Sequence, residues 1–366
     1  MKSFIKFVVF LAVGCAILFF VYRNQSAAYV LECQCKGGCE YDSLMDKIGN
    51  DFASANIFWL LAICSAFMFS NLSRALRWNM LIEPLGYQPK TFNTFFATMV
   101  GYLVNLALPR AGEVAKPATV TQYEKIPLDK LMGTIVVDRI FDVLMLLVVT
   151  GLTFLLQFDN LYNLLFGDAQ PRPECVSGFV AAEGGFIIPW MLLFQAAVII
   201  GVLVLAVLIV KWKVIKQTAI AQKVLGLLAN FGEGVKTVAQ LKNPLMFVVH
   251  TVLIWLMYYL MMYLCFFAYG PTANLPASAA LLAFVFGTFG MVIPSPGGMG
   301  TYQIAVTAAL VIYGVQEADA FAFSNIIFFT ITIFCNIVFG LIAYIVLPIY
   351  NKGYEPVLPA AHTEQD

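Results

Sequence analysis

Long apolar runs separated by short polar connections make up most of this chain. Each of the longest runs is near or above the roughly 20 residues that a helix needs to cross a hydrocarbon core about 30 Å thick. These runs are residues 4–22, 52–72, 131–157, 187–210, 245–269 and 321–349. The pattern predicts six membrane-spanning helices.

Two further apolar segments, 91–122 and 278–315, are interrupted by proline and glycine at 107–113 and 292–298. Lipid offers no partner to a freed backbone N–H or C=O, so irregular chain at membrane depth must be buried in protein or line a wet cavity. We therefore predict two broken or re-entrant helical hairpins. The polar content of 110–125 favours re-entry for the first of them.

Composition settles the broad class. Hydrophobic residues make up 61% of the chain and charged residues 11%, with a mean hydropathy of +0.84, which excludes an ordinary soluble protein. The prediction is an all-α polytopic membrane protein with one transmembrane domain over 1–350 and a cytoplasmic tail at 351–366. Residues 4–22 have no convincing cleavage site, so we expect an uncleaved first helix.

Positive charge predicts the orientation, provided that both broken segments enter and leave on one side. That side then carries Lys2, Lys6, Arg74, Arg77, Lys90, Lys125, Lys130, Lys211, Lys213, Lys216, Lys223, Lys236, Lys242 and Lys352. The opposite side carries Arg23, Lys36, Lys47 and Arg172. The positive-inside rule then predicts a cytoplasmic amino terminus and an extracytoplasmic, cysteine-containing loop at 23–51. The cysteines of that loop and the lack of a transit peptide are compatible with a cell inner membrane.

The order span, broken hairpin, span occurs twice, in 52–157 and in 245–349. With the single run 187–210 between them, the second copy enters from the opposite face. This pattern predicts an inverted repeat, a common plan among transporters. Coincidence is the alternative, because proline and glycine are frequent in membrane helices.

Ionisable residues at membrane depth are costly and usually face a partner or a cavity. The candidates are Arg110, Glu113, Lys116, Asp138, Arg139 and Asp142. Arg139 and Asp142 have the i,i+3 spacing of an ion pair within one helix. We interpret the set as a substrate site whose arginines bind a phosphate group; the alternative is that these groups only tie two helices together.

The second break carries no charge, but its glycines leave backbone amides open to an anion. The candidate contacts here are Pro294, Ser295, Gly297, Gly298, Gly300, Tyr302 and Gln303. Close approach of two backbones explains the glycines equally well.

The cysteines predicted outside the membrane are Cys33, Cys35, Cys39 and Cys175. An oxidising exterior favours disulfides among them, and their spacing does not match a standard zinc pattern. The chain has no Walker-type phosphate loop and only two histidines, His250 and His362. We therefore expect no catalytic residues, no metal, no cofactor and no nucleic-acid partner.

Three motifs carry a family resemblance: Pro-Arg-Ala-Gly-Glu at 109–113, Val-Asp-Arg-Ile-Phe-Asp at 137–142 and Pro-Ser-Pro-Gly-Gly-Met-Gly at 294–300. Over about residues 50–350 the chain resembles the lysylphosphatidylglycerol synthase transmembrane family, also described as flippase-like. Arg110 follows Pro109 directly, one residue away from the family's pattern. The resemblance implies a stand-alone member, without the aminoacyl-transfer domain, that moves or presents a polar lipid.

The leading hypothesis is a lipid flippase in which Arg110 and Arg139 bind an anionic head group and Glu113 is their resting counter-ion. The expected partner is membrane lipid, with a homo-oligomer or an envelope-synthesis partner also open. One alternative is a membrane-embedded transferase or an accessory subunit of lipid or cell-envelope synthesis. The other is an ion-coupled transporter of a soluble anion.

Overall fold

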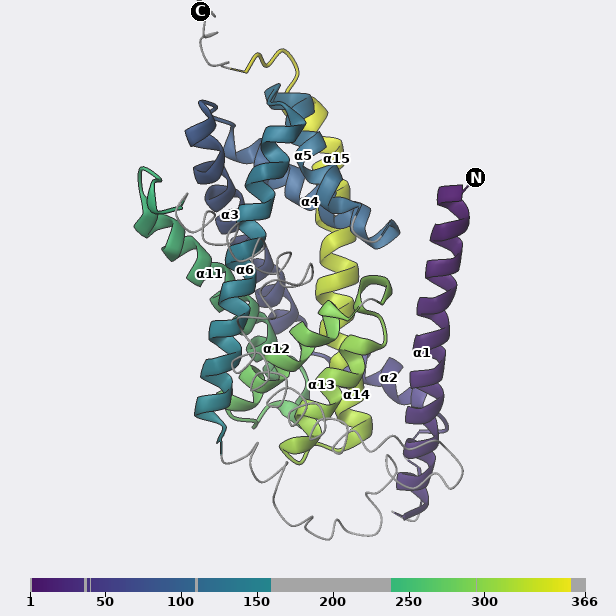
Figure 1. The fold of residues 1–366 in the computed structure, drawn as a ribbon. Coiled ribbons are helices and arrows are strands. Elements are labelled where there is room, and N and C mark those ends of the chain that lie inside the picture. Colours follow the sequence, from purple (N-terminus) through teal and green to yellow (C-terminus); the bar gives the residue numbers. More distant parts are fainter. Residues whose placement is uncertain are drawn as a thin grey trace, which may run out of the picture.

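Helices form all of the regular structure in the described part of the computed structural model (Figure 1). The described residues are 2–35, 38–39, 41–108, 111–158, 238–293 and 295–356. The predicted span 187–210 and most of the predicted tail lie outside them.

Among the described residues, four helices are long and apolar enough to cross a membrane. They are Ile57–Leu85, Leu128–Leu156, Pro244–Ala268 and Glu317–Tyr350, which contain α3, α6, α11 and the α14–α15 unit. These correspond to the predicted spans 52–72, 131–157, 245–269 and 321–349. The chain is thus a multi-pass helical membrane protein.

The predicted span 52–72 is wrong at both ends. Residues 52–54 close the separate helix α2 (Leu44–Ser54), and α3 (Ile57–Ile82) starts only after Asn56, whose Oδ1 accepts a hydrogen bond from the amide N of Phe58 at 3.0 Å. At its other end α3 continues ten residues beyond 72. Arg74 and Arg77 suggested a loop, whereas the structure buries both inside the bundle.

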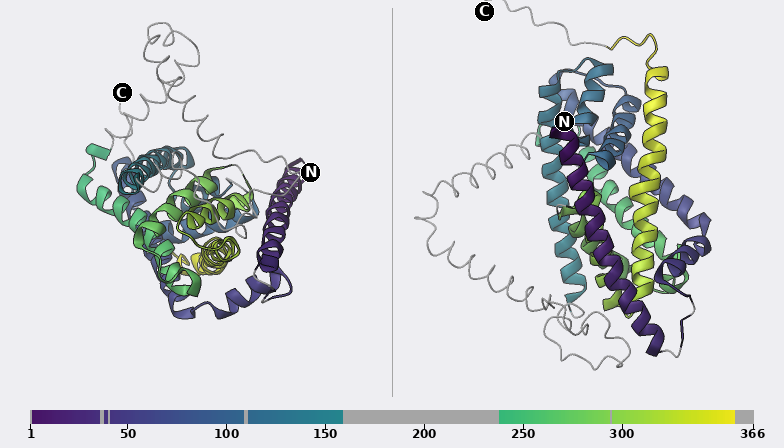
Figure 2. Two further views of the ribbon diagram at one scale, coloured as in Figure 1. Left: turned by 90° about the horizontal axis from the view of Figure 1, so that it is seen from below. Right: turned by 90° about the vertical axis from the view of Figure 1, so that its right-hand side faces the viewer.

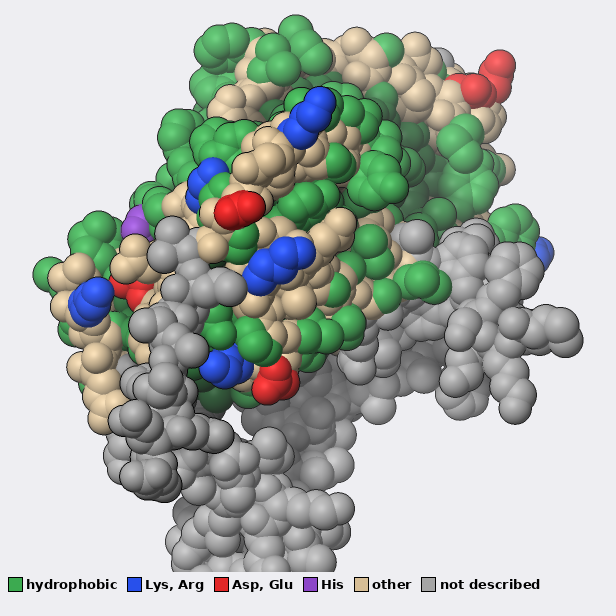
Figure 3. Space-filling model, turned by 90° about the horizontal axis from the view of Figure 1, so that it is seen from above, with side chains coloured by type: hydrophobic (Ala, Val, Ile, Leu, Met, Phe, Trp, Pro, Cys, Tyr) green, Lys and Arg blue, Asp and Glu red, His purple; other side chains and the backbone are tan. Residues whose placement is uncertain are grey.

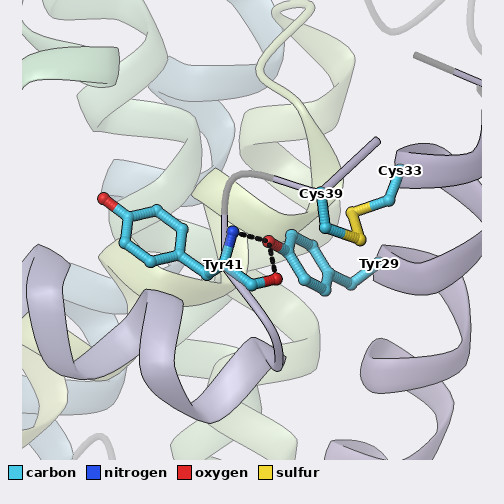
Figure 4. Close-up of a disulfide and its surroundings, with 4 residues drawn as sticks. All are labelled: Tyr29, Cys33, Cys39 and Tyr41. Carbon is cyan, nitrogen blue, oxygen red and sulfur yellow. Dashed lines mark hydrogen bonds between the residues drawn. A yellow bond between two sulfur atoms is a disulfide. The ribbon is translucent and has the colours of Figure 1, made fainter. Parts of the chain in front are cut away.

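Helix α1 (Lys2–Cys35) extends well beyond the predicted span 4–22, so most of the region 23–51 is helical in α1 and α2. A disulfide joins Cys33, in the last turn of α1, to Cys39 (Figure 4). Beside it, the Tyr29 hydroxyl donates to the Tyr41 carbonyl oxygen at 3.2 Å and accepts from the Tyr41 amide. Cys175 lies outside the described residues.

The first broken segment is a hairpin of α4 (Thr91–Ala107) and α5 (Gly112–Glu124). Its arms pack closely at Gly101 and Gly112, where a Cβ atom on Gly112 would clash with the Gly101 carbonyl oxygen. The Asn105 side chain closes the turn by accepting a hydrogen bond from the Gly112 amide N at 2.8 Å.

The second broken segment is a hairpin of α12 (Ala277–Val292) and α13 (Thr301–Ile312), with the short helix η3 (Pro296–Gly298) at its turn. Gly287 and Gly290 lie against Tyr302 and Thr301, so these arms also touch at glycines. The hairpins enter the bundle from opposite ends, and their turns point to its middle (Figures 1 and 2). There η3 contacts α4.

The contacts between helices are arranged in matching pairs. The first long helix of the first half, α3, packs on the first long helix of the second half, α11 (Pro244–Ala268). Helix α15 (Asn336–Tyr350) packs on α4, while α6 (Leu128–Leu156) packs on α12. In each half, therefore, the last long helix lies against the hairpin of the other half.

At the end where α12 begins, an ionic cluster fastens α2 to the start of α14 (Glu317–Phe328). The Lys47 ammonium donates to Asp51 at 2.8 Å and to Asp319 at 2.6 Å. The Tyr269 hydroxyl donates to the same carboxylates at 3.0 and 3.1 Å. Burial by itself lowers the Lys47 pKa, but Asp319 and Asp51 outweigh it, so the pKa lies above the usual 10.5.

The raised pKa of Lys47 predicts that the free energy of unfolding depends on pH, and that the Lys47→Met substitution removes this dependence. The Lys47 contribution to the free energy of unfolding should be complete below about pH 10 and should fade as the pH rises through the folded-state pKa. Burial and the two carboxylates also raise the pKa of Tyr269 above its usual 10. The measurement is the unfolding of the wild-type and Lys47→Met proteins in detergent, followed from about pH 8 to 12. A difference between the proteins that is constant across this range contradicts the prediction.

Candidate functional site

A buried ionic cluster joins α3 to α6. Arg74 Nη1 lies 3.0 Å from Asp142 Oδ2 and 3.6 Å from Asp138 Oδ2. Arg77 Nη2 lies 2.5 Å from Asp138 Oδ1 and 2.8 Å from Asp142 Oδ1. The i,i+3 spacing of the arginines matches the i,i+4 spacing of the aspartates, so two guanidiniums face two carboxylates across the helix interface.

Helix α11 completes the polar shell around this cluster. Arg74 Nη2 donates to the Tyr258 hydroxyl at 2.8 Å, and Arg77 Nη1 donates to Thr251 Oγ1 at 3.3 Å. The side chain of Arg77 has no exposed surface. Buried charges are tolerated when they are paired. Each arginine here faces both aspartates, although Arg74 Nε and Arg77 Nε make no hydrogen bond.

Lys116 lies inside the bundle without a carboxylate partner in the described part of the chain. Its ammonium sits 4.1 Å from the ring centroid of Trp78, a cation–π contact, and the residue is 8% exposed. The Trp78 indole N–H donates to Thr134 Oγ1 at 2.8 Å, which fixes the ring. The protein thus buries a lysine side chain at depth against an aromatic face.

Outside the buried cluster, a half-exposed ion pair lies between α5 and α6. Arg139 Nε is 3.5 Å from Glu113 Oε1, and the two side chains are 46% and 47% exposed. Arg139 Nη1 also contacts Asp142 Oδ2 at 3.3 Å. Asp142 therefore connects the exposed pair to Arg74 and Arg77.

The exposed pair borders a groove of about 320 Å³ on the face of α6. Its lining is Glu113, Met132, Ile135, Val136, Arg139, Ile140 and Val143. Most of this lining is apolar, and of the four long helices α6 is the least buried. The groove thus combines an apolar wall with one charged corner.

Charge at the site is unequal. The described cations are Arg74, Arg77, Lys116 and Arg139, and the described carboxylates are Glu113, Asp138 and Asp142. One cation is therefore left without a counter-charge among them. Arg110, the sixth predicted member of the set, lies outside the described residues.

The uncharged turn of the second hairpin makes its side-chain hydrogen bonds mainly within the hairpin. Ser295 Oγ lies 2.7 Å from Thr301 Oγ1, and the Gly300 amide N donates to Gln303 Oε1 at 2.8 Å. Gly297, Gly298 and Gly300 have φ of 59°, 79° and 83°, which favour glycine and produce the tight turn.

Tyr302 packs its ring on Phe328, with centroids 5.5 Å apart. Pro294 lies outside the described residues. In the described part of the chain, no hydrogen bond or ion pair joins this turn to the charged cluster. The structure thus keeps these two groups of predicted site residues separate.

Sequence reasoning placed Arg139 beside Asp142 and close to Glu113, and the structure brings all three together. It missed Arg74 and Arg77, which it treated as cytoplasmic loop charges. Their i,i+3 spacing directly after an apolar run was the available signal. Lys116 shares α5 with Glu113, but it points to Trp78 rather than to the groove.

Residues 42–338 match the family model described as Lysylphosphatidylglycerol synthase TM region. The chain belongs to this family. The matched range contains α2, both hairpins and every described residue of the charged cluster.

The resemblance deduced from three short motifs is thereby confirmed. Membership of the family makes the chain a membrane protein of lipid or envelope biosynthesis or transport. Helix α1 and the residues after 338 lie outside the match. Searches of curated proteins and of solved structures found no match.

Proposed function

We propose that this protein is a flippase that carries a lipid with an anionic head group across the cytoplasmic membrane. The observation that carries this proposal is the half-exposed Glu113–Arg139 pair at the charged corner of an apolar groove. The groove wall suits an acyl chain, and the corner suits a head group. The lipid family supports the same assignment.

In the proposed mechanism the head group replaces Glu113 as the partner of Arg139. A guanidinium fork matches phosphate oxygens with two parallel hydrogen bonds, so the exchange keeps Arg139 satisfied. Asp142 then couples the exposed corner to Arg74 and Arg77, and the protein itself catalyses no covalent reaction.

The two hairpins are proposed to re-enter the membrane without crossing it. Their arms have 17, 13, 16 and 12 residues, fewer than the roughly 20 that a crossing helix needs. The paired contacts of α15 with α4 and of α6 with α12 support an inverted repeat. In this proposal the amino terminus is cytoplasmic.

The basic end of the bundle fits that orientation. Figure 3 views the end at which α5 and α15 finish, where lysine and arginine side chains are spread among hydrophobic and acidic ones. Lys90, Lys125 and Lys130 flank the base of the first hairpin at this end. The positive-inside rule assigns such an end to the cytoplasm.

The test is transport by the purified protein in vesicles of phosphatidylcholine that contain labelled phosphatidylglycerol. Arg139→Ala should slow its movement about 10- to 100-fold, because a hydrogen bond to a charged group contributes about 1.5–3 kcal/mol. Lys130→Ala, an exposed cation on the same helix, is the matched control and should transport normally. A folded Arg139→Ala protein with an unchanged rate sinks the proposal, and a chemically altered lipid would favour the transferase instead.

A further inference from the structure

A buried carboxylate ties together the two arms of the first hairpin at their base. Glu124, the last residue of α5, is 3% exposed. Its Oε1 accepts from the Asn93 side chain at 2.6 Å and from the Lys90 amide N at 3.0 Å. Asn93 is in the first turn of α4, and Lys90 is the residue just before it.

The segment after α15 completes this clamp. The Tyr354 hydroxyl donates to Glu124 Oε2 at 3.0 Å. Asn351 and Asn93 exchange side-chain hydrogen bonds of 2.8 and 2.9 Å, and the Lys90 ammonium lies 3.5 Å from the Tyr354 ring centroid. Asn351 and Tyr354 follow residue 338, so they lie outside the part of the chain that matches the family.

A matching clamp lies at the other end of the bundle. Gln157 follows α6 directly and is 2% exposed. Its Nε2 donates to the carbonyl oxygen of Ser278, at the start of α12, at 2.8 Å. Its Oε1 accepts from the hydroxyl of Tyr313, the residue that follows α13. One side chain therefore bridges both arms of the second hairpin.

We infer that each hairpin is fixed at its base by positioning residues that follow the last long helix of the opposite half. These residues are Asn351 and Tyr354 for the first hairpin and Gln157 for the second. A buried carboxylate or amide is costly unless its hydrogen bonds are made, so each base has one favoured arrangement. Movement is then confined to the turns, which meet in the middle of the bundle.

The clamps bear on the site through α5. Glu113 and Glu124 lie eleven residues apart on this helix, or roughly 16 Å along its axis. A shift of the clamped end therefore moves Glu113 relative to Arg139, which is on α6. This step of the inference rests on the proposed lipid transport; the clamps themselves do not.

Hydrogen exchange read by mass spectrometry tests the clamps without reference to transport. The Asn351→Ala/Tyr354→Phe protein should exchange about tenfold faster in peptides from 91–124 and normally in peptides from 277–312. Gln157→Ala should show the opposite selectivity. Tyr350→Phe is the matched control, because it removes a neighbouring hydroxyl for which the described residues provide no hydrogen-bond partner.

Equal changes in the hydrogen-exchange rates of both hairpins, or no change in either, would overturn the inference whatever the transport assay shows. Selective exchange in a protein that moves no lipid supports the clamps and removes the proposed function. If the wild type does move lipid, Asn351→Ala/Tyr354→Phe should lower the maximal rate several-fold and leave the half-saturating lipid concentration unchanged. An unchanged rate despite a loosened hairpin overturns the positioning role.

Discussion

Arg77→Ala is expected to lower the free energy of unfolding by about 3–5 kcal/mol, the cost of removing one partner from a buried ion pair. The change leaves Asp138, which is 1% exposed, with Arg74 as its remaining cation, at 3.6 Å. Asp142 keeps Arg74 and Arg139. Denaturation of the purified protein in mixed micelles measures the loss, and the yield of folded protein should fall with it.

Two further variants test whether this loss is specific to the buried ion pair. Arg23→Ala removes an exposed arginine of α1 and should have little effect on stability. Adding Asp138→Asn to Arg77→Ala should recover part of the loss, because it removes the uncompensated charge. If Arg77→Ala unfolds like the wild type, the cluster does not hold α3 against α6.

Gly112→Ala should be the next most damaging change, because the new methyl group would clash with the Gly101 carbonyl oxygen and with Asn105. Overpacking of this kind costs about 1–3 kcal/mol. It should also separate α4 from α5 and shift the neighbouring Glu113. Unfolding in mixed micelles and hydrogen exchange of peptides from 91–124 report the two effects.

Gly133→Ala is the matched control for this change. Gly133 is inside α6, and a Cβ atom there meets nothing within 4 Å. Alanine in a helix interior should leave stability unchanged or raise it by about 0.5–1 kcal/mol. Equal losses in the Gly112 and Gly133 variants would show that the close contact of α4 and α5 is unimportant.

Local pattern was sufficient to locate the breaks in both hairpins. Proline and glycine interrupt hydrogen bonding within a helix, and this signal is read from neighbouring residues alone. The structure ends α4 at Ala107 and starts α5 at Gly112, and it ends α12 at Val292. The Arg139–Asp142 pair was accessible for the same reason, since both residues belong to one turn of one helix.

The partners of Arg74 and Arg77 were not accessible in this way. A charge directly after an apolar run has the same local pattern whether it enters water or meets a counter-charge in the bundle. Asp138 and Asp142 lie more than 60 residues away, so the pairing depends on how α3 and α6 pack. The same limit applies to Lys116 on the face of Trp78.

The sequence by itself determined the membrane class, the approximate positions of four long helices, the two broken segments and the family of this protein. Those features depend on hydrophobicity, on proline and glycine, and on short motifs, all of which act over a few neighbouring residues. Tertiary structure alone decided which charges are buried and where the groove lies. It also decided which helix ends clamp the hairpins, because buried polar groups take their partners from segments that are distant in the chain.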